Sequence, residues 1–353
     1  MQATPRRQTR SYSNVGTAES SRILAGALAV LLALGTGQGA LGAYTGTPEE
    51  EPQKGPVIRR DVDLVLVEAT VRDGAGHPMK GLKQDDFLLY EESVQQEIAH
   101  FSQDQLPLAV ALVVDQSGSI KPFLQPLQYA TLTALRTLKS EDQVALFVFS
   151  NETELLEDLT YDKRRVSDHF ETLDAGGSTN INDALFLAAD YLRREAPKSR
   201  RVIILVSDNV PTDPGMVSPN EVITETLEAD ASIYSIKIPG ENPGLPVPGT
   251  RKRIPTIGAA IGGRKVNVAE VAAQTGGEVF DVEKEGSLFL AFQTVIERLK
   301  TRYTLGFYPS HGPDGRFRNV DVKLQPRWGA RGKDYVVLAK RGYYSPRPKP
   351  TNQ

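Results

Sequence analysis

Four continuous apolar runs constrain the fold more than any other feature of this sequence. They are LAVALVVD (108–115), QVALFVFS (143–150), RVIILVSD (201–208) and SIYSIKI (232–238), and a shorter run, EVFDV, follows at 278–282. An apolar run without alternation is typical of a strand that is buried on both faces of a parallel sheet. Segments with helical periodicity lie between these runs, at 124–138, 163–173, 182–194, 220–229, 267–274 and 287–303. The alternation predicts a doubly wound α/β domain with a mostly parallel sheet.

Patterns typical of β-strands lie on both sides of this α/β region. Residues 61–72 alternate as DVDLVLVEATVR, and a second short strand is expected at 87–90. After Tyr303, strands are expected in YTLGFYP, FRNVDVKLQ and DYVVLAKRGYY. Neither flank has enough strands to bury a stable core alone, so we expect the two flanks to share one small β-sandwich-like module. Residues 239–264 are rich in Gly and Pro and predict an inserted surface loop.

The first 43 residues differ in kind from the rest. Four arginines precede the apolar run Ile23–Leu34, and small residues continue to Ala43. A basic segment, an apolar segment and a tail of small residues predict an export signal, with an uncleaved N-terminal membrane anchor as the alternative. The predicted division of the chain is a signal peptide or anchor (1–43), a linker (44–58), an N-terminal β segment (59–104), the α/β domain (105–300), a C-terminal β segment (301–347) and a tail (348–353).

Composition excludes several kinds of functional site. The chain has no cysteine, which excludes disulfides, thiolate metal ligands and a cysteine nucleophile. Its formal charge is -3 and it has no long basic tract, so no nucleic-acid partner is expected. The four histidines lack a metal-binding spacing such as HExxH. A metal ion would therefore be held mainly by oxygen ligands.

Oxygen-bearing side chains follow the apolar runs. Asp115 ends the first run, and Ser117 and Ser119 follow at a spacing of two. Thr179 comes after two glycines and directly before a helical segment, and Asp208 ends the run RVIILVSD. Because ligands of an open parallel sheet collect at the carboxyl ends of its strands, we expect these oxygens to converge. Hard oxygen donors of this kind suit Mg²⁺ or Mn²⁺ in octahedral geometry.

The charge of this ligand set indicates what such a site could do. Three hydroxyls are neutral, and one of the two carboxylates can act through water, so the ion would be incompletely neutralised. It would then attract a further carboxylate, which predicts a non-enzymatic binding protein that captures an Asp or Glu side chain of a protein partner. The alternative is a structural or assembly subunit of a cell-envelope complex, in which the domain is a scaffold.

The three motifs VVDQSGS, GGSTN followed by DAL, and VSDN resemble the loops of the metal-ion-dependent adhesion site of von Willebrand factor A-type domains. The resemblance covers roughly residues 105–300, and the motifs occur in the family's order. It implies that Asp115, Ser117 and Ser119 take the DxSxS positions of the family's metal site. It also implies that Thr179 takes the threonine position and Asp208 the last aspartate position. The resemblance implies a metal-dependent adhesive function.

One position departs from the family pattern, because Asn209 stands where the family often has Gly. This departure puts a water-mediated contact of Asp208 in question. The flanks VEATVRDGAGHPMKGLKQDDFLLYEE and YTLGFYPSHGPDGRFRNVDVKL are similar to exported bacterial proteins described as VWFA-related, common in Acidobacteria. That family has no settled function to carry over.

Enzymatic alternatives lack residues that they need. Haloacid-dehalogenase-like phosphatases require a second acid two positions after the first aspartate, where this chain has Ser117. A P-loop requires lysine where GGSTN has Asn180, and no GxSxG motif for a serine hydrolase is present. We therefore predict that the protein is not an enzyme.

An acidic cluster in the N-terminal β segment has a simpler interpretation. Asp85, Asp86, Glu91 and Glu92 are predicted to form a solvated rim of a strand. The alternative is that one of these acids, or an acid of a second copy, is the group that the metal site binds.

Overall fold

The computed structural model describes residues 64–103, 106–239, 265–282, 285–329 and 334–348, all of which belong to one unit, 59–353. The predicted signal peptide or anchor, the linker and nearly all of the predicted inserted loop lie outside the described residues. No helix in the described ranges is long and apolar enough to cross a membrane.

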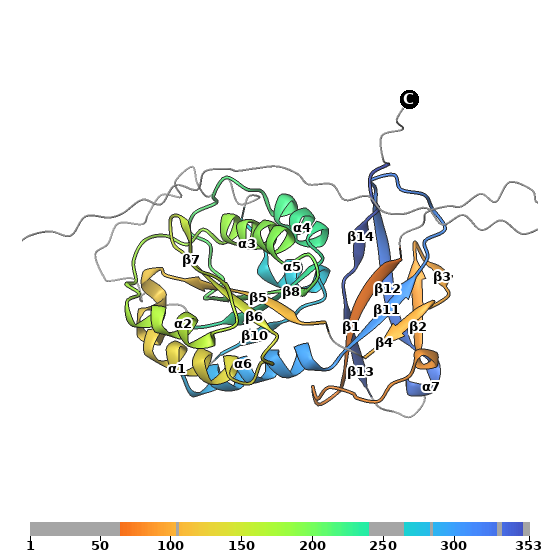
Figure 1. Cartoon of the computed structure of the whole chain (residues 1–353), viewed down its shortest axis with the longest axis horizontal. Helices are drawn as coiled ribbons and strands as arrows, with labels where there is room; N and C mark the ends of the chain where they lie inside the picture. The colour runs from red at the N-terminus through yellow and green to blue at the C-terminus, as the bar shows by residue number, and fades with distance from the viewer. Residues whose placement is uncertain (1–63, 104–105, 240–264, 283–284, 330–333, 349–353) are drawn as a thin grey trace, which may run out of the picture. The chain divides into compact units, whose positions relative to one another are not determined.

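The predicted parallel sheet is present and has six strands in the order β10-β9-β8-β5-β6-β7 (Figure 1). All its neighbours pair in parallel except β7, which is antiparallel to β6 at the edge. Every residue of the central strand β5 is buried, as a continuous apolar run predicts. The strands are β5 (Leu108–Asp115), β6 (Gln143–Phe149), β7 (Thr153–Thr160), β8 (Arg200–Ser207), β9 (Ala231–Lys237) and β10 (Val279–Asp281).

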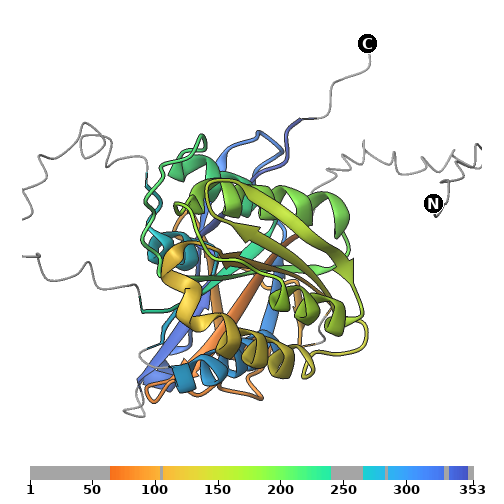
Figure 2. The same ribbon diagram turned by 90° about the vertical axis from the view of Figure 1, so that its left-hand side faces the viewer.

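Helices cover both faces of this sheet (Figure 2). Val110 and Val114 of β5 belong to one core with α1, α2 and α6, whereas Ala111 and Val113 belong to a second core with α3, α4 and α5. The helices are α1 (Leu124–Leu135), α2 (Lys163–Asp168), α3 (Ile181–Glu195), α4 (Pro219–Glu228), α5 (Val268–Gln274) and α6 (Glu285–Lys300), with short 3-10 helices η2 (Gly118–Phe123) and η3 (His169–Glu171). The predicted fold class, a doubly wound α/β domain, is confirmed.

The two flanks form two four-stranded sheets, and each sheet contains strands from both ends of the chain. The orders are β13-β1-β11-β4 and β14-β12-β2-β3. Their shared core includes Leu89, Leu305 and Val322, so neither flank forms this core alone. The elements are β1 (Val65–Asp73), η1 (Gln84–Asp86), β2 (Phe87–Glu91), β3 (Val94–Gln96), β4 (His100–Ser102), β11 (Arg302–Phe307), β12 (Phe317–Leu324), α7 (Pro326–Gly329), β13 (Tyr335–Ala339) and β14 (Gly342–Tyr344).

Strand β1 joins this β module to the α/β domain. Its residues Val67, Ala69 and Val71 are 0% exposed in the core of the β module. Glu68, on the opposite face of the strand, accepts a hydrogen bond from Arg200 Nε of β8 at 2.7 Å and another from Arg302. Burial raises the pKa of Glu68, but the two guanidinium groups outweigh that effect and lower it to about 2. An internal ion network therefore connects the module and the domain.

Several details differ from the sequence-based expectations. The short strands β3 and β4 and the edge strand β7 have no counterpart among the expected strands. In β7 the charged residues of TELLEDLT interrupt the apolar pattern, as an edge strand allows. The segment DYVVLAKRGYY forms two strands in different sheets. The solvated-rim interpretation is wrong for Asp86 and Glu91, which are 8% and 1% exposed. Asp86 accepts a hydrogen bond from Trp328 Nε1 at 2.9 Å, and Glu91 accepts one from the Tyr343 hydroxyl at 2.6 Å.

Candidate metal site

The loop after β5 places its polar side chains together. Asp115 is 1% exposed, and its Oδ1 accepts the backbone N–H of Ser117 at 2.7 Å. The hydroxyl oxygens of Ser117 and Ser119 lie 2.9 Å apart, and the chain then enters η2. The backbone N–H of Gln116 donates to the carbonyl of Phe149 at 2.7 Å, which holds this loop to the end of β6. The three residues of the DxSxS motif therefore share one tight turn.

The loop that carries Thr179 packs against the first loop. The Gly176 N–H donates to the carbonyl of Gln116 at 2.6 Å. Gly177 has a φ of +93°, and a Cβ at this position would lie 2.7 Å from Oδ1 of Asn151, so the position requires glycine. Thr179 itself is 3% exposed. Within the described residues its hydrogen bonds use its backbone N–H and carbonyl, so its hydroxyl is available as a ligand.

The loop after β8 completes the arrangement. Strands β5 and β8 are parallel neighbours, and Val114 is in register with Val206, so Asp208 follows β8 at the same sheet edge as Asp115. Thr212, further along this loop, accepts the N–H of Thr179 at 2.7 Å and donates its own N–H to the Thr179 carbonyl at 3.1 Å. Hydrogen bonds thus join all three loops that carry the five predicted ligands.

Electrostatics at the site favour a cation. Burial raises the pKa of Asp115, the hydrogen bonds from Ser207 and Ser117 lower it, and the negative charge of Asp208 raises it again, with a net increase. The two carboxylates are therefore close enough to repel each other. A divalent cation would relieve this repulsion, and the oxygens of the surrounding hydroxyls are suitable ligands for Mg²⁺. The charge and the oxygen ligands of these residues therefore fit a divalent metal ion.

No cluster of three or more His, Cys, Asp or Glu side chains that could hold a metal ion occurs in the described part of the chain. A site on this sheet edge must therefore combine hydroxyl oxygens with its two carboxylates. Nor does His169 belong to it, because its Nε2 lies 3.1 Å from Oε2 of Glu157, a residue of edge strand β7.

Asn209 keeps the backbone conformation that a glycine would supply. Its φ is +59°, in the left-handed region where Asn is among the residues best tolerated after Gly. Its side-chain amide exchanges hydrogen bonds with the hydroxyl of Ser235 on β9, at 2.9 and 3.1 Å. Asn209 therefore adopts the left-handed conformation and also ties the Asp208 loop to β9. The backbone N–H of Val210 donates to Asp208 Oδ1 at 2.8 Å, which fixes the carboxylate.

The sequence does not single out two residues that help to form these loops. Ser207 donates its hydroxyl to Asp115 Oδ2 at 2.7 Å, and Asn151 accepts the N–H of Ser178 at 2.7 Å. Both lie beside the ends of strands that the apolar runs predict, but a serine or an asparagine at such a place carries no distinctive spacing.

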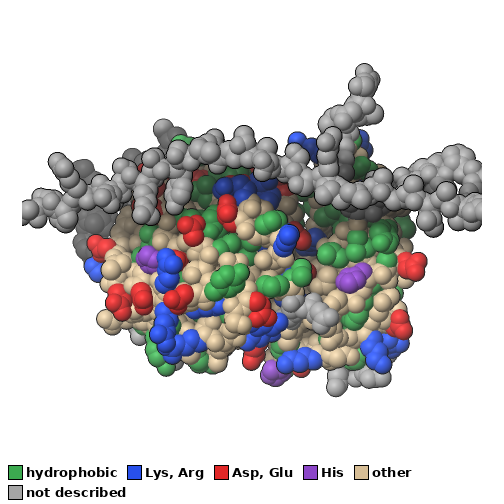
Figure 3. Space-filling view, in the orientation of Figure 1, with side chains coloured by type: hydrophobic (Ala, Val, Ile, Leu, Met, Phe, Trp, Pro, Cys, Tyr) green, Lys and Arg blue, Asp and Glu red, His purple; other side chains and the backbone are tan. Residues whose placement is uncertain are grey.

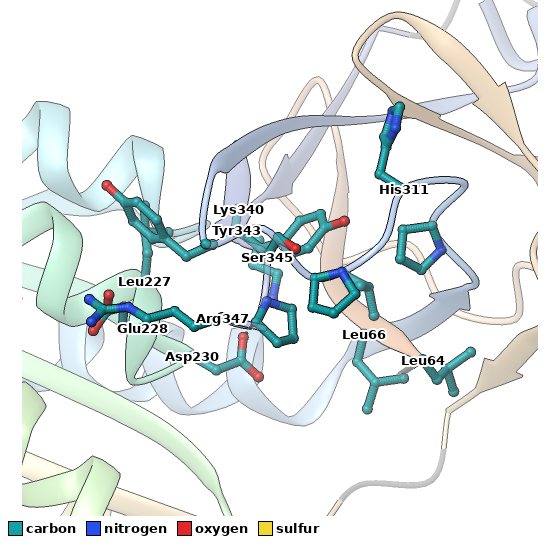
Figure 4. Close-up of a pocket in the computed structure, with 16 residues that line it drawn as sticks. Leu64, Leu66, Leu227, Glu228, Asp230, His311, Lys340, Tyr343, Ser345 and Arg347 are labelled. Carbon is teal, nitrogen blue, oxygen red and sulfur yellow. Dashed lines mark hydrogen bonds and ion pairs between the residues drawn. The ribbon is translucent and has the colours of Figure 1, made fainter. Parts of the chain in front are cut away.

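A cavity of about 610 Å³ is lined by residues of the β module and of α4 (Figure 4). Leu66 and Leu227 contribute apolar lining, and Lys340 Nζ is 2.6 Å from Asp230 Oδ1. None of the five predicted metal ligands lines it. Charged side chains of both signs are interspersed on the face shown in Figure 3.

Comparison with known protein families agrees with this geometry. Residues 110–210 match the von Willebrand factor type A domain. This part of the chain is therefore similar to a von Willebrand factor A-type domain, as its motifs predict.

Curated relatives match only part of this chain. The chain is 30% identical to inter alpha-trypsin inhibitor, heavy chain 4, of Mus musculus in an alignment of 154 positions that covers 39% of this chain and 16% of that protein. It is 29% identical to inter-alpha-trypsin inhibitor heavy chain H4 of Homo sapiens in an alignment of 143 positions that covers 37% of this chain and 15% of that protein. The chain thus matches about a sixth of the length of these relatives.

Similar solved structures include an aerotolerance-related membrane protein from Bacteroides fragilis, with 18% identity and a TM-score of 0.40, covering 54% of this chain and 99% of that chain. Another is proximal thread matrix protein 1 from the mussel byssus with a zinc-occupied MIDAS motif. It has 16% identity and a TM-score of 0.42, and the likeness covers 59% of this chain and 49% of that chain.

Proposed function

We propose that the protein is a non-enzymatic binding protein that holds Mg²⁺, or Mn²⁺, at the loop edge of its α/β domain and uses the ion to bind a carboxylate of a protein partner. The proposed ligands are Asp115, Ser117, Ser119, Thr179 and Asp208. The observation that carries the proposal is that hydrogen bonds join the three loops bearing two buried carboxylates and three hydroxyls.

The chemistry follows from the charge of the ligands. Asp115 and the hydroxyls would contact the ion, and Asp208, fixed by its bond to the Val210 N–H, would act through water. The ion supplies a Lewis acid with an incompletely neutralised charge. The protein residues orient the ligands and leave a coordination position toward solvent, which an Asp or Glu side chain of a partner can fill.

The remaining parts of the proposal concern location and organisation. The basic, apolar and small-residue pattern of residues 1–43 supports an exported protein, either periplasmic or secreted, or held at the membrane by an N-terminal anchor. Residues 59–104 and 301–347 would form the β module around an α/β domain at 105–300. The alternative is a structural or assembly subunit of a cell-envelope complex, in which the α/β domain is a scaffold.

Two measurements test the proposal. Titration calorimetry should show Mg²⁺ binding to the purified protein and none to Asp115→Ala, while Asp168→Ala, which removes an exposed acid of α2, should bind like the wild type. Equal heats for wild type and Asp115→Ala would contradict the metal claim.

Pull-down of envelope proteins with and without a chelator separates adhesion from scaffolding. Loss of the partner on chelation supports binding through the ion. Recovery of the same partner in the presence of chelator would favour the scaffold.

A further inference from the structure

Both carboxylate oxygens of Asp115 already accept a hydrogen bond from the protein. Oδ1 accepts the backbone N–H of Ser117, and Oδ2 accepts the hydroxyl of Ser207, each at 2.7 Å. Ser207 is 0% exposed and closes β8, whereas Asp115 closes the neighbouring strand β5. Each oxygen has two lone pairs, so each keeps one for a cation. The carboxylate cannot rotate about its bond without losing both hydrogen bonds.

The Ser207 hydroxyl has a second partner besides Asp115. The backbone N–H of Asn209 donates to Ser207 Oγ at 3.1 Å. Because this N–H only donates, the hydroxyl proton of Ser207 stays available, and it is donated to Asp115 Oδ2. The hydroxyl therefore stabilises the ionised carboxylate, the form that binds a metal ion.

Asn209 is held in turn by β9. Its amide donates to Ser235 Oγ at 2.9 Å and its carbonyl accepts the Ser235 hydroxyl at 3.1 Å. Ser235 is 0% exposed. The left-handed backbone of Asn209 directs its N–H toward Ser207. A continuous chain of hydrogen bonds thus runs from β9 through Asn209 and Ser207 to Asp115.

We propose that Ser207 and Asn209 are positioning residues for the metal site, which act through Asp115 and do not contact the ion. This inference rests on the proposed function. Groups that orient metal ligands typically change metal affinity by about 10-fold to 100-fold when they are removed.

The same arrangement sets the denticity of Asp115. Because each oxygen already accepts one hydrogen bond, contact through both oxygens would need both remaining lone pairs to face the same ion, so coordination through one oxygen is favoured. Single-oxygen coordination suits the octahedral shell of Mg²⁺, whereas the larger Ca²⁺ readily takes both oxygens of a carboxylate. Loss of the Ser207 hydroxyl frees Oδ2, so it should reduce the preference for Mg²⁺ over Ca²⁺.

Calorimetry with Mg²⁺ and Ca²⁺ on the purified protein tests this role. Ser207→Ala should weaken Mg²⁺ binding by about 10-fold or more and lower the ratio of Mg²⁺ to Ca²⁺ affinity. Ser207→Thr keeps the hydroxyl and should bind Mg²⁺ with an affinity close to that of the wild type. Asn209→Gly keeps the backbone conformation but removes the amide bridge to Ser235, so its affinity should fall between those of the wild type and Ser207→Ala.

Thermal unfolding in EDTA serves as the control for structure. A purely structural role would lower the melting temperature of Ser207→Ala without changing the affinity ratio of the folded protein. Unchanged Mg²⁺ affinity in Ser207→Ala, with a wild type that binds, would overturn the inference and leave the proposed function standing. If Ser207→Ala does not fold, wild-type affinity in Asn209→Gly would overturn the inference in the same way. A wild type that binds no Mg²⁺ would overturn both.

Discussion

Replacing Glu68 by Gln should destabilise the protein, because Glu68 is the only carboxylate that its two arginine partners share in the described network. Arg200 and Arg302 are each buried, with side chains 6% and 3% exposed. Glutamine keeps the shape of the side chain and removes its charge. Two guanidinium groups would then remain inside the protein without a counter-charge.

The magnitude follows from the pKa of Glu68, which lies at about 2 in the folded protein against an ordinary value of 4.5. A shift of this size corresponds to about 3 kcal/mol at neutral pH. Because the Glu68 side chain is 26% exposed, water screens part of the interaction. We expect a loss of about 2–3 kcal/mol in the free energy of unfolding.

Urea denaturation of wild type and Glu68→Gln at a series of pH values is the assay. The stabilisation by Glu68 is fully present above pH 4.5 and is lost as the pH falls toward about 2, so the two proteins should converge in acid. Glu154→Gln, an exposed glutamate of edge strand β7, is the matched control and should unfold like the wild type. A difference below about 0.5 kcal/mol at pH 7, or one that does not change between pH 7 and pH 3, would refute the reasoning.

Three further predictions concern the loops and the β module. Gly177→Ala should lower the free energy of unfolding by about 1–3 kcal/mol and weaken Mg²⁺ binding, because φ is +93° and the added Cβ would lie 2.7 Å from Asn151 Oδ1. In the control Gly118→Ala the added Cβ has no atom within 4 Å, so this variant should unfold at the wild-type temperature. Tyr343→Phe should lower the free energy of unfolding by about 1–3 kcal/mol, since it leaves the buried Glu91 carboxylate without its 2.6 Å bond, and a wild-type urea midpoint would contradict this. Mg²⁺ affinity should fall with acid at a higher pH than for an ordinary aspartate, because the pKa of Asp115 is raised and protons compete with the ion. Calorimetric titrations from neutral into acid pH check this, and an affinity that does not fall before an ordinary aspartate protonates would argue against Asp115 as a ligand.

The α/β domain is predictable because the sequence pattern of its strands is distinctive. LAVALVVD and RVIILVSD are buried on both faces, and a strand of that kind has only one common setting, the middle of a parallel sheet. The same runs end in Asp115 and Asp208, so the sheet edge that carries the candidate site follows directly. The candidate ligands could be named from two features of the sequence, their positions just after predicted strands and their spacing. Hydrogen bonds join the loops that carry these residues.

Other features depend on partners far away in the sequence. Glu91 and Tyr343 are separated by 252 positions, and neither residue shows that the other will cover it, so the sequence alone predicts a surface acid at Glu91. The role of Ser207 cannot be seen in the sequence either, because its hydrogen-bond partner Asp115 lies 92 positions away, on the neighbouring strand. Edge strand β7 has too few apolar residues to be recognised without the sheet beside it.

The most direct test of the central claim is diffraction from crystals of the protein grown with Mn²⁺, whose anomalous signal identifies the ion. We predict one strong anomalous peak at the loop edge of the sheet, with oxygens of Asp115, Ser117 and Ser119 at bonding distance, and no such peak in Asp115→Ala. Density for Mn²⁺ at another place only, or none in wild-type crystals that contain excess Mn²⁺, would contradict the account.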